Sequence, residues 1–260
     1  MPIISAAGIE TRVIPTAVLS THTGGFKDYV KEDLTSIILP TVEHWQSLGL
    51  LADAIYSGYL ASKEQLEIVA DVFKRLSHKN TLIAIDPVMG DDGVLYDSFD
   101  DEFVCEMRKF LKYADVVLPN LTEACLLLNK PYRECGYDEC EIKDMLKSLC
   151  KMGPKMAVIT GVEYGDGRIG VATFDALTDS YGYFYSPKVK GVFLGTGDVV
   201  ASAIVSGLTV GLSLESSVKV AVDMAYNSIV HTVKSPYDYR YGVDFESAIE
   251  QFIKDLKSEK

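Results

Sequence analysis

The chain has 260 residues, of which 48% are hydrophobic, enough to bury the core of one large α/β domain. Its formal net charge of −12 argues against binding nucleic acid or an anionic membrane by charge alone. A nucleotide is not excluded, because proteins hold phosphates with backbone N–H groups, a few cations and a divalent metal. We find neither a basic, apolar leader nor an uncharged apolar run of about 18 residues, so we expect a cytoplasmic protein without a membrane span.

Short apolar runs typical of strands alternate with runs whose apolar residues have helical spacing. The expected strands cover residues 12–19, 53–57, 81–86, 115–118 and 156–160, followed by an antiparallel pair at 169–174 and 181–186. The expected helices cover residues 31–48, 63–76, 100–112, 121–129, 139–151, 197–211, 214–234 and 244–257. This alternation predicts a mainly parallel sheet with helices on both faces, in a single domain that spans residues 1–260.

Ligands of such sheets bind at the carboxyl ends of the strands, so the segments that follow the strands are the candidates for function. In chain order these segments are STHTGGF, SGY, DPVMGDDG, PNLTE, TGVEYGDG and, after a loop, GTGD. They are polar and rich in glycine, and the predicted sheet gathers them on one edge.

The last of these segments reads Gly195-Thr196-Gly197-Asp198 and precedes an apolar helix. Its glycines allow a tight turn and a close approach of the backbone to a ligand. The first N–H groups of a buried helix have no intrahelical partner, so they could form an anion hole for a transferring phosphoryl group. Asp198 would then accept the proton of an attacking hydroxyl. The simpler alternative is that Thr196 or Asp198 only caps the helix, which contributes about 1 kcal/mol.

Clustered carboxylates follow two further strands. Asp86 ends an apolar strand, and Asp91 and Asp92 lie on the glycine-rich turn behind it. Asn120 and Glu123 begin the next helix, three residues apart. Oxygen ligands beside a phosphate site suit Mg²⁺. The alternatives are a solvated acidic turn and an ordinary capping box.

Thr160 ends another strand, where its hydroxyl could bond a phosphate oxygen or could simply be a threonine at a strand end. The P-loop pattern G-x-x-x-x-G-K-[ST] is not present, so the P-loop class is excluded.

Taken together, PTAVLSTHTGGF, DPVMGDDGVLY, VLPNLTEA, VITG and GTGDVVASAIVSGL resemble the pyridoxal/pyridoxamine (vitamin B6) kinases of the ribokinase-like superfamily. The resemblance runs from residue 2 to about residue 235, although GTGD alone marks only the superfamily. It implies a ribokinase-like three-layer sandwich. It also implies ATP-dependent phosphorylation of the 5′-hydroxymethyl group of pyridoxal, pyridoxine or pyridoxamine, which yields the 5′-phosphate and ADP.

The resemblance also implies a role for each site residue. Asp198 is the base, residues 195–197 form the anion hole, and Asp91 with Glu123 organises Mg²⁺. The residues implied at ATP are Asp86, Asn120, Thr160, Val189, Phe193 and Thr196. The residues implied at the vitamin ring, besides Asp198, are His22, Thr23 and Tyr59. For His22 a place in the core, and for Tyr59 plain packing, are the alternatives. A monovalent cation and a homodimer are implied as well.

The chain departs from the family at its start. Family members begin with a strand, a turn with glycine and serine, and then the helix that PIISAAGIE resembles. Here Met1 and Pro2 stand at the start of that helix, so we expect a fold that lacks the usual first strand. In the family this strand is central and supplies a serine that contacts the substrate ring. Its loss would expose two strand edges and apolar faces.

Other functions remain open at this point. Hydroxymethylpyrimidine kinases belong to the same superfamily, and a non-catalytic protein that binds a nucleotide or a vitamer would fit a shortened chain. A purely structural component of an oligomer is disfavoured, because polar motifs cluster at the strand ends.

Overall fold

The computed structural model describes residues 1–22, 26–163, 166–236 and 238–260. Its main sheet has six strands in the order β10-β9-β8-β7-β4-β3. These are β3 (Ala52–Ser57), β4 (Ser77–Ile85), β7 (Val116–Val117), β8 (Met156–Val162), β9 (Arg168–Asp175) and β10 (Ser180–Pro187). The four from β3 to β8 run parallel, whereas β9 and β10 are added antiparallel. Both the mainly parallel sheet and the antiparallel pair are therefore confirmed.

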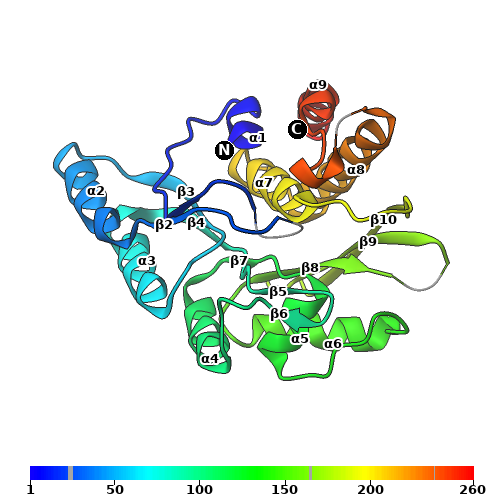
Figure 1. Cartoon of the computed structure of the whole chain (residues 1–260), viewed down its shortest axis with the longest axis horizontal. Coiled ribbons are helices and arrows are strands. Elements are labelled where there is room, and N and C mark those ends of the chain that lie inside the picture. Colours follow the sequence, from blue (N-terminus) through cyan, green and yellow to red (C-terminus); the bar gives the residue numbers. More distant parts are fainter. Residues whose placement is uncertain (23–25, 164–165, 237) are drawn as a thin grey trace.

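Helices cover both faces of this sheet and make three layers (Figure 1). The helices are α1 (Pro2–Ala6), α2 (Thr35–Ser47), α3 (Lys63–Leu76), α4 (Asp101–Phe110), α5 (Leu121–Leu128), α6 (Glu139–Cys150), α7 (Thr196–Thr209), α8 (Leu214–Lys234) and α9 (Ile249–Ser258). One apolar cluster packs helices α3, α4, α5 and α6 against one face of the sheet. A second cluster packs α1, α7, α8 and α9 against the other face. None of the helices in the described residues is long and apolar enough to span a bilayer.

Local chemistry sets the start of the amphipathic helices. The Ser62 hydroxyl accepts the N–H of Gln65 at 3.2 Å and caps α3, and the Asp100 carboxylate accepts the N–H of Phe103 at 2.7 Å and caps α4. Each cap satisfies a backbone N–H group that has no partner inside its helix.

Two expected boundaries differ in the structure. The helix expected over 31–48 begins only at Thr35, because β2 (Lys31–Asp33) pairs antiparallel with β1 (Ala17–Leu19). The strand expected over 12–19 is paired only at its end, since Pro15 has no N–H group to donate and residues 9–15 find no strand partner in the described part of the chain. A second short hairpin, β5 (Gly90–Asp91) with β6 (Val94–Leu95), lies in the glycine-rich turn after β4.

Short 3₁₀ helices account for other boundary shifts. They are η1 (Leu111–Tyr113), η2 (Tyr239–Tyr241) and η3 (Glu246–Ala248). The last of them replaces the first turn of the helix expected over 244–257, so the regular helix starts at Ile249.

The sheet stops at β3. In the described residues β3 forms a ladder with β4 alone, which leaves its second edge without a strand. The sequence predicted two exposed strand edges, and the structure describes one edge of the main sheet, that of β3, without a strand partner in the described residues.

Helix α7 lies beside α8 on one face of the sheet (Figure 1), and residues 199–207 are all buried. Gly207 permits the close approach of the two helices: a Cβ atom at this position would lie 2.5 Å from the Oγ atom of Ser217 on α8. This contact holds the helix that carries Asp198.

We expect Gly207→Val to lower the free energy of unfolding by about 2 kcal/mol, because the added methyl groups must push α8 away. Urea denaturation measures the change. Thr209→Val is the matched control, since it places the same side chain at the half-buried end of the same helix. Equal stability of the two variants would show that Gly207 does not set the packing of α7 on α8.

Candidate active site

The carboxyl ends of β4, β7 and β8 bring three of the predicted segments side by side. Asn120 forms a parallel bridge with Thr160, and the N–H of Thr160 donates to the carbonyl of Pro119 at 3.0 Å. The N–H of Leu118 donates to the carbonyl of Ile85 at 2.9 Å, next to Asp86. The ladder therefore fixes Asp86, Asn120 and Thr160 along one edge, as the sequence predicts.

Glu123 ties two of these segments together. It is only 3% exposed, and its carboxylate accepts the N–H of Met89 at 3.1 Å and that of Asn120 at 2.9 Å. The side chain of Asn120 accepts the N–H of Glu123 at 2.8 Å and donates to the carbonyl of Gly90 at 2.8 Å. The capping box is thus present, and it also fixes the loop after β4 to the start of α5.

Asp86 is buried, and its carboxylate accepts the hydroxyl of Tyr56 on β3 at 3.2 Å. Burial, and then the negative charge of Asp198, raise the pKa of Asp86 to about 8. Burial, and then the charge of Asp86, raise the pKa of Glu123 well above its usual range. Such carboxyl groups gain from a nearby cation, which would favour their charged forms.

The start of α7 has the features of an anion hole. Gly195 is its N-cap residue, with φ of 83°, and no side chain caps the helix in the described residues. The hydroxyl of Thr196 donates instead to the carbonyl of Phe193 at 2.9 Å. A purely capping role for Thr196 or Asp198 is therefore wrong. The first N–H groups of α7 remain available to an anion.

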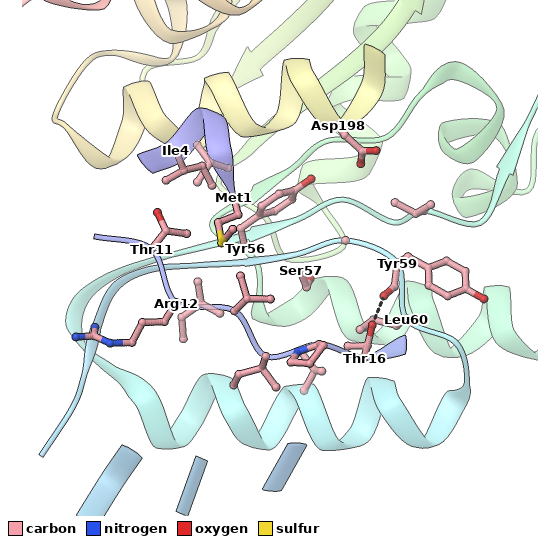
Figure 2. A pocket seen from close by; sticks show the side chains of 18 of the residues that line it. Met1, Ile4, Thr11, Arg12, Thr16, Tyr56, Ser57, Tyr59, Leu60 and Asp198 are labelled. Carbon is pink, nitrogen blue, oxygen red and sulfur yellow. Dashed lines mark hydrogen bonds between the residues drawn. The ribbon is translucent and has the colours of Figure 1, made fainter. Parts of the chain in front are cut away.

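Asp198 lies in this first turn, and the partial burial of its carboxyl group raises its pKa. It borders a cavity of about 1480 Å³ (Figure 2). Among the predicted residues, the lining of this cavity includes His22, Tyr59, Asp91, Gly195 and Asp198.

The predicted residues at the vitamin ring reach the cavity from β1 and β3. His22 is exposed, so it is not a core histidine, and its Nε2 atom lies against the carbonyl of Arg240. Tyr59 accepts a hydrogen bond from the Nζ of Lys31 at 3.1 Å. Thr23 lies outside the described residues.

The residues predicted at the adenine and ribose lie in the loop before α7. Val189 is half-buried, and Phe193 packs against the apolar cluster of α7 and α8. Neither lines the cavity. The predicted contact of both with the nucleotide stays a prediction.

Asp91 is exposed on β5, and partial burial raises the pKa of its carboxyl group. No three Asp, Glu, His or Cys side chains within the described ranges are arranged to bind a metal ion. Any metal here would have to complete its shell with other ligands.

Lys31, Tyr56 and Tyr96 are among the polar cavity residues to which sequence reasoning gave no role. Burial, followed by the charge of Asp91, raises the pKa of Tyr96. The polar character of Tyr56 in the apolar run DAIYS is a signal that could have found it. The sequence held no such signal for Lys31, because this residue was predicted to lie in a helix rather than in β2.

The mainly parallel α/β sheet, with acids at its carboxyl edge beside an uncapped helix start, is the arrangement of a phosphoryl-transfer enzyme. Residues 4–239 match the model of the phosphomethylpyrimidine kinase family, and the chain belongs to this family.

Solved structures and a curated enzyme place the chain more closely. A protein of Bacteroides thetaiotaomicron described as a phosphomethylpyrimidine kinase, solved with pyridoxal, is 36% identical and covers 96% of this chain and 88% of its own, with a TM-score of 0.91. The pyridoxal kinase of Lactobacillus plantarum is 29% identical, covers 97% of this chain and 89% of its own, and has a TM-score of 0.88. The pyridoxal kinase of Ovis aries is 28% identical over 78% of this chain and 69% of its own length. The chain spans about two thirds of the length of the curated relatives that it matches.

The raised pKa of Asp86 predicts how stability changes with pH in the absence of ligands. Between the ordinary pKa of about 3.9 in the unfolded chain and about 8 in the folded protein, the folded state binds more protons. Its stability therefore falls as the pH rises through this window.

We expect Asp86→Asn to flatten this fall, so that at pH 8 it gains on the order of a few kcal/mol relative to wild type, compared with pH 5. Urea denaturation at several pH values measures the slope. Asp92→Asn, an exposed aspartate on the next turn, is the matched control. A wild-type slope in Asp86→Asn would place the titrating group elsewhere.

Proposed function

We propose that this chain is one kinase domain that transfers the γ-phosphoryl group of ATP to the 5′-hydroxymethyl group of pyridoxal, pyridoxine or pyridoxamine. The products are the vitamer 5′-phosphate and ADP. The observation that carries the proposal is the uncapped start of α7, with Asp198 in its first turn at the border of a large cavity. The similarity to pyridoxal kinases, and to a protein solved with pyridoxal, supports the choice of substrate.

Asp198 accepts the proton of the attacking hydroxyl. Its raised pKa brings the carboxylate closer to the working pH, which suits a general base. The backbone N–H groups of residues 195–197 then stabilise the charge on the transferring phosphoryl group. Catalysis rests on position and electrostatics rather than on covalent chemistry.

Asp91 and Glu123 would hold Mg²⁺ or its waters. The residues fit this ion, because Mg²⁺ in kinases is usually bound by one or two carboxylates together with substrate phosphates. Burial raises the pKa values of both carboxyl groups, and a cation beside them would favour their charged forms. Mg²⁺ bound there would supply positive charge against the phosphates, and a monovalent cation would bind at the same acidic edge.

The remaining ATP contacts come from the strand ends and the loop before α7. Asp86, Asn120 and Thr160 line the phosphates, while Val189 and Phe193 lie near the adenine and the ribose. His22, Thr23 and Tyr59 contact the pyridine ring. The Nζ of Lys31, bonded to Tyr59, adds a positive charge beside this group. We further propose a cytoplasmic homodimer, as the resemblance to pyridoxal kinases implies.

Hydroxymethylpyrimidine kinase activity is the second candidate, because the family model that matches the chain is that of phosphomethylpyrimidine kinases. This reaction would use the same base and anion hole, but its substrate carries a pyrimidine ring instead of a pyridine ring. Only the substrate-ring contacts separate the two candidates.

A substrate panel tests the proposal. Purified protein with Mg·ATP is expected to release ADP with at least one of pyridoxal, pyridoxine and pyridoxamine, and more slowly with hydroxymethylpyrimidine. A coupled assay for ADP measures turnover. The reverse preference would favour the second candidate, and bound ATP without any turnover would favour a binding protein.

Asp198→Asn tests the base. We expect kcat to fall by a factor on the order of 10² to 10⁴, the usual contribution of a general base, with ATP binding retained in calorimetry. Glu215→Gln removes the acid from the first turn of α8 and is the matched control. Turnover of Asp198→Asn at the control's rate would remove Asp198 from this role.

A further inference from the structure

Lys31 borders the cavity as a cation without a carboxylate partner. The lysine and arginine side chains that line the cavity in the described residues are Arg12 and Lys31. Arg12 is bound to Glu10 at 2.5 Å, whereas no ion pair among the described residues includes Lys31. An ammonium group at a cavity without such a partner favours a negatively charged group on the ligand.

The hairpin of β1 and β2 directs Lys31 toward the cavity. Lys31 lies directly opposite Leu19 in the antiparallel ladder, so the two side chains share one face of the hairpin. Leu19 and Thr21, two residues apart on that face, both line the cavity. The N–H of Ser20 donates to the carbonyl of Val30 at 2.9 Å, and this bond extends the pairing beyond the ladder. The orientation of Lys31 therefore follows from strand pairing.

Tyr59 holds the end of the lysine side chain. The Nζ of Lys31 donates to the Tyr59 hydroxyl at 3.1 Å and lies 5.5 Å from the centre of its ring. The carbonyl of Tyr59 accepts the hydroxyl of Thr16 at 3.0 Å, which fixes the segment after β3 (Figure 2). A lysine ammonium has three donors and no acceptor, and the Tyr59 hydroxyl keeps its own proton when it accepts from Lys31. The pair thus presents hydrogen-bond donors to the cavity.

Such a pair distinguishes the two candidate substrates. All B6 vitamers carry a 3-hydroxyl group on a pyridine ring, and this group ionises readily because the ring nitrogen withdraws electrons. Hydroxymethylpyrimidine carries an amino group instead, which offers donors and no negative charge. Hydrogen bonds from an ammonium group to an anion are about twice as strong as neutral ones, whereas donors that face an amino group gain little.

We propose that Lys31, together with Tyr59, binds the ionised 3-hydroxyl group of B6 vitamers and so selects a hydroxypyridine over an aminopyrimidine. This inference rests on the proposed function and adds a residue that determines specificity. Lys31 acts on the ring of the substrate, whereas Asp198 acts on the hydroxymethyl group at the same cavity, which both residues line.

Calorimetry without ATP tests this role with two ligands, pyridoxine and 3-deoxypyridoxine, which lacks only the 3-hydroxyl group. We expect the wild-type protein to bind pyridoxine about 10-fold more tightly, the usual effect of one hydrogen bond to a charged group. Lys31→Met should bind both ligands with equal affinity, because it keeps the length of the side chain and removes the charge. Lys31→Arg should retain the preference. Lys79→Met, which changes an exposed lysine of β4 away from the cavity, is the matched control.

The coupled assay for ADP gives a second readout. Lys31→Met should raise KM for pyridoxine about 10-fold and change kcat by less than about twofold, because Lys31 does not act on the reacting hydroxyl. KM for hydroxymethylpyrimidine should stay unchanged. The melting temperature should stay at the wild-type value, since Lys31 is exposed.

Four results would overturn the proposal. They are no binding of either ligand by the wild-type protein, equal binding of both, a preference that persists in Lys31→Met, and an equal loss of both ligands in this variant. The last result would mean that Lys31 only holds Tyr59 in place.

The proposed kinase activity fails in a different way. A binding preference that depends on Lys31, without turnover of any vitamer, would support the inference and reject the kinase. Turnover of vitamers without this preference would reject the role of Lys31 and leave the kinase in place.

Discussion

The parallel pairing of β4, β7 and β8 is the constraint on which the rest of the site depends. Because the three strands run in one direction, the segments that leave them meet at one edge, where Asn120 pairs with Thr160. Polar and acidic side chains from three distant parts of the sequence are thereby held without help from their own packing. The apolar clusters on the two faces stabilise the ladder, so the core supplies the rigidity that the acidic edge cannot.

The side chains at this edge lower the stability of the unliganded protein. Burial, together with the charge of Asp198 on Asp86 and that of Asp86 on Glu123, raises the pKa values of these two carboxyl groups, and the start of α7 keeps backbone donors without side-chain caps. These features destabilise the empty site, but they would favour a bound cation and a bound anion respectively. A metal–triphosphate ligand carries both. The buried acids and the uncapped donors are therefore what is expected of a site that is complementary to its ligand rather than to water.

The sequence predicted the parts of the site that local chemistry determines. Gly195 and Asp198 before an apolar helix, and the pair of Asn120 and Glu123 at the start of α5, were found because each motif sits within a few residues. The sequence could not place Lys31, since a charged stretch before a helix does not reveal that it pairs with β1. Tyr56 was missed for a similar reason: its bond to Asp86 crosses from one strand to the next.

Strand β3 connects the catalytic edge to the cavity. Its residue Tyr56 donates to Asp86 and lines the cavity, and the next residue, Ser57, accepts at its carbonyl the N–H of Asp86 at 2.9 Å. A strand held by a ladder on one edge alone is freer to shift than one held on both. Any shift of β3 would move both bonds to Asp86 together.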